Sequence, residues 1–296
     1  MTLDVFAQYL ITGVCVGCIY AIVAIGFNII YNTTGIINFA QGEFVMCGGM
    51  TALAFYQWLP LPLAVVAAVV VTMLLGAAIE FLFIRWLSRP TVLRTIIITI
   101  GISILIREAA WHIWGNQVRA LPPFSGDETS SLVILGAHVT PQKIWVLATC
   151  AALVAALGFF FSYSLLGKMM RACAANRNAA ALCGINTRNL VTFAFMLSAG
   201  LGALAGCVIS PVTQTTYDIG PGLAVKGFTV AILGGMGSSG AAVAAGILLG
   251  VVEAFCTHYM PLAFKDALAL GLLLLILFVR PHGLFGNRAL AQLKEC

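Results

Sequence analysis

Charged residues are scarce in this sequence. Only 8% of its 296 residues are Asp, Glu, Lys or Arg, whereas 61% are hydrophobic, and the mean hydropathy is +1.04. Soluble domains contain about 25% charged residues, so this composition excludes an ordinary water-soluble domain. At about 20 residues per crossing, the chain has room for roughly eight transmembrane helices with loops. We therefore predict an all-α integral membrane protein with one polytopic domain, residues 1–296.

Other features are missing, and each absence argues against a class of site. The first charged residue of the chain is Asp4, and no basic segment precedes the first apolar run. We therefore expect this run to be a retained helix rather than a cleaved signal peptide. The chain has no G-x-x-x-x-G-K-[ST] loop, so we expect it not to bind ATP itself. We also expect it to bind no other cofactor. His258 and His282 lack a second ligand at metal spacing, and no nucleophile and base cluster together. We therefore expect neither a metal site nor an enzyme.

Long apolar runs make up most of the chain. The predicted spans cover residues 6–30, 36–58, 61–84, 95–114, 144–164, 189–217 and 262–279. "YNTTG" (31–35) is predicted to be a turn between the first two spans. The stretch "GFTVAILGGMGSSGAAVAAG" (227–246) is interrupted by Gly and Ser, which predicts a broken helix or a short crossing followed by a second one. Because such glycine-rich segments can be broken or re-entrant helices, the sequence does not determine how many times residues 222–262 cross the membrane.

Basic residues are unevenly distributed between the loops. If residues 85–94, 165–188 and the tail 280–296 share one side, that side holds Arg85, Arg89, Arg94, Lys168, Arg171, Arg177, Arg188, Arg280, Arg288 and Lys294. The other side holds Asp4, Asp127, Glu128 and Asp218, with Arg119 and Lys143 as its main bases. Because Lys and Arg mark cytoplasmic loops, we predict a cytoplasmic C-terminus and an external N-terminus. The net charge of +5 then reflects membrane topology, not nucleic-acid binding.

The loop at about 165–190 contains an unusual stretch, "GKMMRACAANRNAAALCGIN" (167–186), framed by Gly167 and Gly184. Asn176 is a competent N-cap and Gly184 suits a left-handed C′ position, which predicts a two-turn helix between them. Isolated helices this short are unstable in water, so something should hold it. One interpretation is a positively charged membrane anchor. The other is a docking helix, in which small residues such as Ala180 allow close approach and Arg171 and Arg177 pair with acidic groups of a partner.

Polar residues inside the predicted spans are candidates for a substrate path, because each is costly in hydrocarbon. Asn38, Gln41 and Glu43 lie near the start of the second span among helix-loosening glycines. Discontinuous helices expose backbone groups that can bind a zwitterion. Lys226 and Thr229, near a second glycine-rich region, are their possible counterpart in an internal pseudo-repeat. The alternative is that Glu43 sits at the cytoplasmic interface and reaches into water.

Four further charged residues lie near predicted span ends. They are therefore expected to be interface residues rather than members of a transport relay: Arg107, Glu108, Glu80 and Glu253.

Four motifs in order carry a resemblance that spans essentially the whole chain. They are "NTTGIINFAQGEFVMCGG" (32–49), the stretch at 167–186, "GGMGSSGAAVAAGILLGVVEA" (234–254) and "FVRPHGLFG" (278–286). The chain resembles the LivH-type branched-chain amino-acid permeases of bacterial ABC transporters. This implies a multi-pass inner-membrane subunit that pairs with a second permease or a second copy of itself. It also implies two cytoplasmic ATPases, which bind ATP-Mg, and a periplasmic solute-binding protein. The segment 167–186 would then be the loop that couples to the ATPases.

Two alternatives to this function remain at the level of sequence. A permease for urea or short amides is similar in the same motifs, and nothing in the sequence separates it from an amino-acid permease. An ion-driven secondary transporter would need a relay of intramembrane acids, for which only Glu43 is a reasonable candidate. In that interpretation the segment 167–186 has no role.

Overall fold

A computed structural model describes residues 3–87, 91–126, 132–134, 137–259, 264–280 and 283–284. The first half comprises α1 (Leu3–Thr34), α2 (Gln41–Tyr56), α3 (Leu61–Ile79), the π-helical turn η1 (Glu80–Ile84) and α4 (Val92–Trp114). A hairpin of β1 (Leu132–Ile134) and β2 (Ala137–Val139) leads into α5 (Pro141–Tyr163), α6 (Leu165–Ala175) and α7 (Arg177–Leu182). The last part comprises α8 (Thr187–Thr213), α9 (Ile219–Gly234), α10 (Ser239–Tyr259) and α11 (Phe264–Val279).

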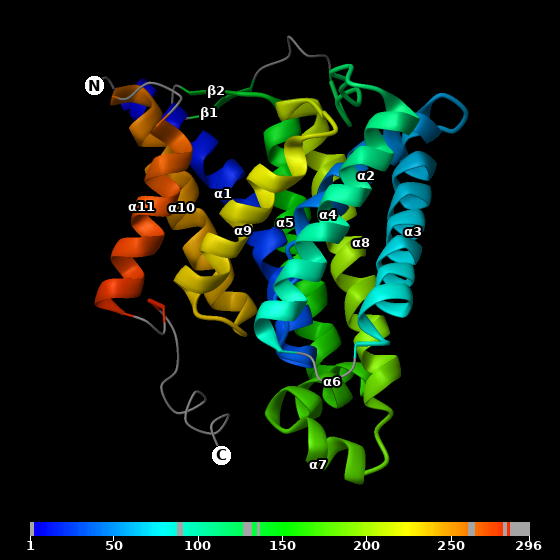
Figure 1. Cartoon of the computed structure of the whole chain (residues 1–296). Helices are drawn as coiled ribbons and strands as arrows, with labels where there is room; N and C mark the ends of the chain where they lie inside the picture. Colours follow the sequence, from blue (N-terminus) through cyan, green and yellow to red (C-terminus); the bar gives the residue numbers. More distant parts are fainter. Residues whose placement is uncertain are drawn as a thin grey trace.

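The long helices run between two ends of the molecule, which we call the hairpin end (β1 and β2) and the α7 end (Figure 1). Within the described part of the chain, five helices are long and apolar enough to cross a membrane: residues 4–34, 61–84, 141–163, 187–213 and 239–257. Helices α2, α9 and α11 have only 16 residues each, fewer than the roughly 20 that a full crossing needs. The prediction of a helical membrane protein is confirmed, and the region 227–246 forms a short helix followed by a second one.

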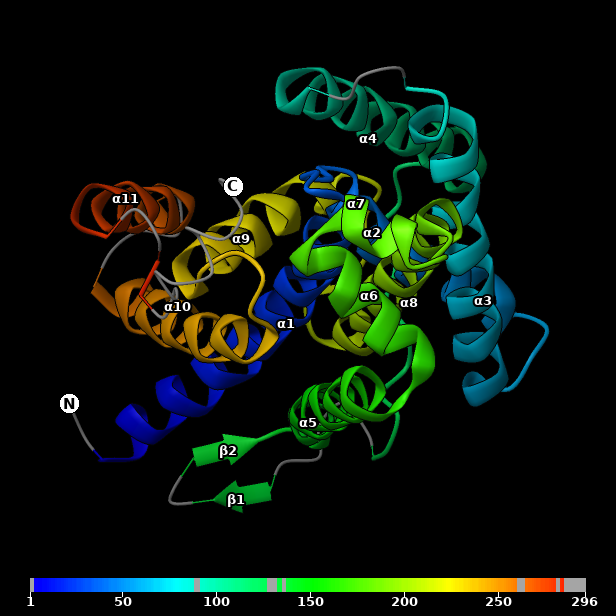
Figure 2. The ribbon, with the colours of Figure 1, turned by 90° about the horizontal axis from the view of Figure 1, so that it is seen from below.

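Helix α1 is central to the bundle and packs most closely against α10 (Figure 2). Glycines permit this approach: a Cβ on Gly13 would lie 2.7 Å from Val251 Cα, and one on Gly17 would lie 2.7 Å from Ile247 Cα. Gly246 on α10 faces Ala21 in the same way. In lipid, hydrophobic burial does not distinguish helix partners, so close backbone packing between small residues stabilises the pair instead.

Three local predictions differ from the structure. The expected turn at 31–35 is helical as far as Thr34, because the backbone ladder continues until Gly35 N donates to Tyr31 O at 2.7 Å, and the chain leaves the helix at Gly35, where φ is +71°. The hydroxyls of Thr33 and Thr34 bond back to Ile29 O and Ile30 O within this helix. The loop between α4 and α5 contains a hairpin that an all-α prediction did not include, with Val133 paired to His138. Residues 165–175, predicted to be loop, form helix α6, whose N-cap Ser164 accepts a hydrogen bond from Gly167 N.

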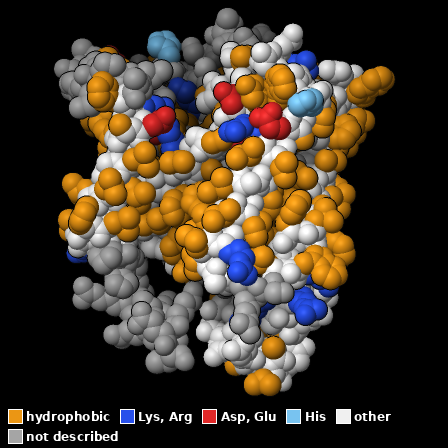
Figure 3. Space-filling view, in the orientation of Figure 1, with side chains coloured by type: hydrophobic (Ala, Val, Ile, Leu, Met, Phe, Trp, Pro, Cys, Tyr) orange, Lys and Arg blue, Asp and Glu red, His pale blue; other side chains and the backbone are white. Residues whose placement is uncertain are grey.

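The two ends differ in charge as the sequence predicted. Helices α6 and α7 lie at the same end as the segment after η1 and the end of α9, where Leu284 N donates to Leu233 O. The described bases of that end are Arg85, Arg94, Lys168, Arg171, Arg177, Arg188 and Arg280. The hairpin end carries Asp4, Glu108 and Asp266 together with Arg119, Lys143 and Lys265. Figure 3 shows acidic side chains near the upper, hairpin end and only basic ones near the lower end of this face. Residues 127, 128, 288 and 294 lie outside the described residues.

Candidate functional site

The chain is not helical between α1 and α2, where residues 35–40 enter the interior of the bundle. In this segment, side-chain oxygens accept hydrogen bonds from backbone N–H groups that have no helical partner. Asn38 Oδ1 accepts from Ala40 N at 3.1 Å, and Phe39 N donates to the Thr99 hydroxyl on α4 at 3.3 Å. The Asn38 side chain is fully buried, and its Nδ2 has no hydrogen-bond partner among the described residues. This break is the discontinuous helix that the glycines and polar residues predicted.

Gln41, the first residue of α2, connects three helices. Its Nε2 donates to Ser198 O on α8 at 3.2 Å, and its Oε1 lies 2.6 Å from the Ser198 hydroxyl. That hydroxyl also lies 2.9 Å from Gly26 O on α1, so it can donate to either oxygen. Gln41 is fully buried, and its amide bonds α2 to α8 and packs against Gly26 of α1.

Glu43 lies in the first turn of α2 and is also fully buried. Its Oε1 accepts a hydrogen bond of 2.8 Å from the Ser103 hydroxyl on α4. Its carboxyl group also packs against Gly220 in the first turn of α9, and Oε2 has no hydrogen-bond partner among the described residues. Arg107, one helical turn beyond Ser103, is close enough to interact electrostatically with this carboxylate. Glu43 thus lies inside the subunit and does not reach water at the membrane interface.

The N-termini of two short helices meet at this carboxylate. Gly42 on α2 and Gly220 on α9 are in backbone contact: a Cβ on Gly42 would overlap Gly220 O, and one on Gly220 would overlap the Glu43 carboxyl group. From this point α2 runs to the hairpin end and α9 runs to the α7 end (Figure 1). Each short helix follows a long helix and a non-helical linker, residues 35–40 after α1 and residues 214–218 after α8. This inverted arrangement agrees with the predicted internal pseudo-repeat. It directs two partially positive helix ends toward Glu43.

Lys226 and Thr229 lie on α9, but their side chains do not join those of Asn38, Gln41 and Glu43. Lys226 Nζ lies 2.8 Å from Glu253 Oε1 on α10 and 2.9 Å from Asp266 Oδ1 on α11. The Thr229 hydroxyl donates to Val225 O in its own helix at 2.9 Å. The counterpart of the α2 site in the second half is therefore the start of α9 at Gly220, one to two turns before Lys226.

Two acids that were expected at the interface are buried instead. Glu80 is 2% exposed and accepts from the Thr192 hydroxyl at 2.7 Å. Glu253 is 1% exposed and lies between Lys226 and Lys265, with Lys265 Nζ 3.1 Å from its Oε1. The expectation for both residues is wrong, because distance from a helix end along the chain does not measure burial by other helices.

The predicted two-turn helix is confirmed as α7. Asn176 Oδ1 accepts a hydrogen bond from Ala179 N at 2.9 Å and so caps its start. Gly184 adopts φ +82° just after its end, and Ile185 N donates to Ala180 O at 3.1 Å. Together these bonds satisfy backbone groups that a short helix leaves free at both ends.

The side chains of α6 and α7 divide into two faces. Ala180 is 5% exposed and belongs to the core of its own chain, so it does not face outward as the docking interpretation assumed. Gly167 also faces inward, where a Cβ would lie 2.7 Å from Phe161 Cα. Arg171 and Arg177 are exposed, and Leu182 is 90% exposed. The outward face thus combines two bases with a large apolar side chain.

Comparison with known proteins adds to this geometry. The model of the family described as branched-chain amino acid transport system / permease component matches residues 9–277. The chain is 32% identical to the high-affinity branched-chain amino acid transport system permease protein LivH of Salmonella typhimurium, over 95% of this chain and 96% of that protein. It is 34% identical to the corresponding protein BraD of Pseudomonas aeruginosa, again over 95% and 96%. The chain belongs to this permease family.

A solved structure shares the fold of the permease at much lower identity. It is PsaBC from Streptococcus pneumoniae in complex with Fab, with a TM-score of 0.51, 16% identity and coverage of 93% of this chain and 92% of that chain. The likeness supports a helical membrane fold.

Sequence reasoning missed several residues that complete the permease interior. Ser103, Ser198 and Glu253 contact or extend the predicted sites, yet a serine in an apolar helix carries no distinctive signal. Spacing offered one clue: Ser103 and Arg107 are four residues apart and so share a face of α4. Among the described residues, no group of three or more His, Cys, Asp or Glu side chains is placed to hold a metal ion. His282 and the side chain of His258 lie outside the described residues.

Proposed function

We propose that this permease is the membrane-spanning subunit of a binding-protein-dependent ABC importer for branched-chain amino acids. The observation that carries the proposal is its 32–34% identity, over 95% of the chain, to permeases named for that transport. In this assembly it pairs with a second homologous permease or with a second copy of itself. A periplasmic solute-binding protein delivers the substrate. The chain itself has no ATPase site, and two cytoplasmic subunits bind and hydrolyse ATP-Mg.

We place the α7 end in the cytoplasm and the hairpin end in the periplasm. The support is the set of bases at the α7 end, since short loops rich in Lys and Arg stay in the cytoplasm. The N-terminus is then periplasmic, the C-terminus is cytoplasmic, and the protein lies in the bacterial inner membrane.

Within this frame, two regions have distinct roles. The α2–α9 junction, with Asn38, Gln41 and Glu43, lies beside the substrate path and moves during transport. Two of its buried polar atoms, Asn38 Nδ2 and Glu43 Oε2, have no hydrogen-bond partner among the described residues. Such atoms are costly, so a second conformation that pairs them would be favoured, which supports this role. Lys226 and Thr229 belong to the same α9 helix and would move with it. The outward face of α6 and α7, with Arg171, Arg177 and Leu182, contacts the ATPases, while Gly167, Asn176, Ala180 and Gly184 hold that face in shape.

Reconstitution tests the proposal directly. The permease is placed in proteoliposomes with its partner permease and ATPases, with ATP inside, and the solute-binding protein is supplied outside. We expect uptake of radiolabelled leucine that needs internal ATP and the binding protein and that persists when ionophores collapse ion gradients.

Three other results would contradict it. Uptake of urea in place of leucine would identify an amide permease. Uptake that ionophores abolish and that needs no ATP would identify a secondary transporter. A complex could also hydrolyse ATP in response to the loaded binding protein and yet take up no substrate. That result would show that this chain does not form the substrate path.

A further inference from the structure

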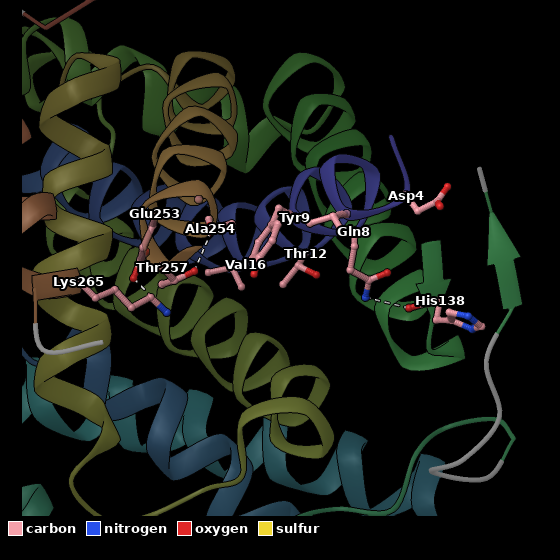
Figure 4. A pocket seen from close by; sticks show the side chains of 12 residues that line it. Asp4, Gln8, Tyr9, Thr12, Val16, His138, Glu253, Ala254, Thr257 and Lys265 are labelled. Carbon is pink, nitrogen blue, oxygen red and sulfur yellow. Dashed lines mark hydrogen bonds and ion pairs between the residues drawn. The ribbon is translucent and has the colours of Figure 1, made fainter. Parts of the chain in front are cut away.

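A pocket of about 560 Å³ opens at the hairpin end, between α1, α10, β2 and the start of α11 (Figure 4). It is separate from the α2–α9 junction and from the face of α6 and α7. Its polar lining includes Gln8, Thr12, Glu253, Thr257 and Lys265. Figure 4 shows Glu253, Thr257 and Lys265 at one end and Asp4, Gln8 and His138 at the other, with Val16 and Thr12 between them.

The charged end of the pocket contains the Glu253 carboxylate, and the side chain of Tyr20 also lies against this group. Glu253 Oε1 is paired with both Lys226 (2.8 Å) and Lys265 (3.1 Å), and the Tyr20 ring lies 5.5 Å from Lys226 Nζ. Glu253 Oε2 is buried and has no hydrogen-bond partner among the described residues. A buried carboxylate oxygen without a donor is costly, so a donor supplied by a ligand would be stabilised there.

The charges around the pocket balance. Among the described residues, the charged side chains that line it or contact its lining are Asp4, Lys143, Lys226, Glu253, Lys265 and Asp266. Lys143 Nζ donates to the Thr12 hydroxyl at 3.0 Å, and Asp266 pairs with Lys226. The three bases and three acids cancel, so a ligand with net charge would leave an unpaired charge in a largely apolar region. A ligand with both charges and no net charge would not.

We propose that this pocket binds a small zwitterion in which a primary ammonium group lies close to an anionic group. The ammonium donates to Glu253 Oε2, and the anion accepts from Lys265, whose side chain is 30% exposed and has donors to spare. An apolar substituent lies against Val16 and Ala254. Two sources have this chemistry: a free α-amino acid and the headgroup of phosphatidylethanolamine. For the free amino acid, the inference rests on the proposed function and describes a site where substrate waits at the outer end.

Direct binding tests the proposal without relying on transport. The complete transporter, without its solute-binding protein and without ATP, is placed in nanodiscs of phosphatidylcholine, which carries no primary ammonium. Binding of radiolabelled leucine is measured, and phosphatidylethanolamine retained through purification is measured by native mass spectrometry. The variants are Glu253→Gln, Lys265→Gln and, as a matched buried acid, Glu80→Gln, which keeps an acceptor for Thr192 outside the pocket.

We expect saturable leucine binding that weakens at least tenfold in Glu253→Gln and Lys265→Gln and is unchanged in Glu80→Gln. Lys265→Gln guards against misfolding, because Lys226 still neutralises Glu253 in that variant. If leucine does not bind but phosphatidylethanolamine is retained by the wild type and Glu80→Gln and lost from the two pocket variants, the lipid is the ligand and the site stands. If neither ligand depends on Glu253 or Lys265, the proposal is overturned.

This outcome is distinguishable from failure of the proposed function. ATP-dependent leucine uptake by a transporter whose pocket binds neither ligand would reject the site and keep the importer. Zwitterion binding in a complex that transports no amino acid would reject the importer and keep the site.

Discussion

The Ser103 hydroxyl on α4 donates a 2.8 Å hydrogen bond to Glu43 Oε1 on α2. Helix α4 lies at the edge of the bundle, whereas α2 begins at the break in its interior (Figure 2). This bond therefore connects a peripheral helix to the point where α2 and α9 meet. A displacement of α4 would change the only hydrogen bond found for the Glu43 carboxylate among the described residues, so the two should move together.

Replacement of Glu43 by Gln tests the role of its charge. The amide keeps the size of the side chain and an acceptor for Ser103, but it removes the negative charge that faces the N-termini of α2 and α9. Each helix terminus contributes about 0.3–1 kcal/mol to such a charge, so we expect uptake to fall by roughly tenfold with assembly intact. Uptake is measured in proteoliposomes, with Glu80→Gln as the control. If Glu43→Gln takes up substrate at the wild-type rate, the negative charge of Glu43 is not needed for transport.

Gln41→Ala should act on stability rather than on substrate. The change removes the hydrogen bonds that hold α2 to Ser198 and leaves buried groups unpaired, at a cost of about 1–3 kcal/mol. We expect a lower Tm of the purified subunit in detergent and less assembled complex in the membrane. A variant with wild-type Tm and assembly but no uptake would instead identify Gln41 as a substrate contact.

Gly220 and Gly222 provide a matched pair on α9. A Cβ on Gly220 would overlap the Glu43 carboxylate, whereas one on Gly222 would meet nothing within 4 Å. Gly220→Ala should therefore displace the Glu43 carboxyl group from its place beside Ser103 and reduce both Tm and uptake. Gly222→Ala should leave uptake unchanged and stabilise the helix by up to about 1 kcal/mol. Equal behaviour of the two variants in Tm and uptake would contradict the close approach of α2 and α9.

Local features of this fold were predictable from the sequence where one residue decides the backbone. Asn176 and Gly184 mark α7 correctly, because a capping side chain and a left-handed glycine act within a few residues. The break before α2 was predicted for the same reason. The turn predicted at residues 31–35 was wrong, because Thr33 and Thr34 belong to α1 and their hydroxyls bond to carbonyl groups of that helix.

Tertiary neighbours were not predictable in this way. Glu253 was assigned to the interface because it lies near a helix end, yet α9 and α11 bring lysines to it from 27 and 12 residues away. Ser103 and Ser198 become important only because α2 packs against α4 and α8. A single sequence records hydrophobic periodicity and caps, but which helices become neighbours depends on the packing of the whole bundle.

The proposed orientation can be tested with reporters that are active only in the cytoplasm. A fusion at Asn178 on α7 should be active, and a fusion within residues 126–131, between α4 and the hairpin, should be silent. The reason is the concentration of Lys and Arg at the α7 end. Expression of both fusions is compared by immunoblot, so that silence is not mistaken for degradation. Reversed activities would place the α7 end outside and remove the basis for contact with ATPases.

Leu182→Ala tests the outward face of α7. Leu182 is 90% exposed beside Arg177, whereas Ala180 packs inward, so bulk at Ala180 would disturb the permease itself. Burying a leucine in a partner groove contributes about 1.5–3 kcal/mol, and its truncation should weaken retention of the ATPases roughly tenfold or more without lowering the Tm of the permease. Co-purification and stimulated ATP hydrolysis are the measurements. Leu132→Ala, an exposed leucine on β1 at the opposite end, is the control. If both variants retain the ATPases equally, α7 is an anchor and not a contact.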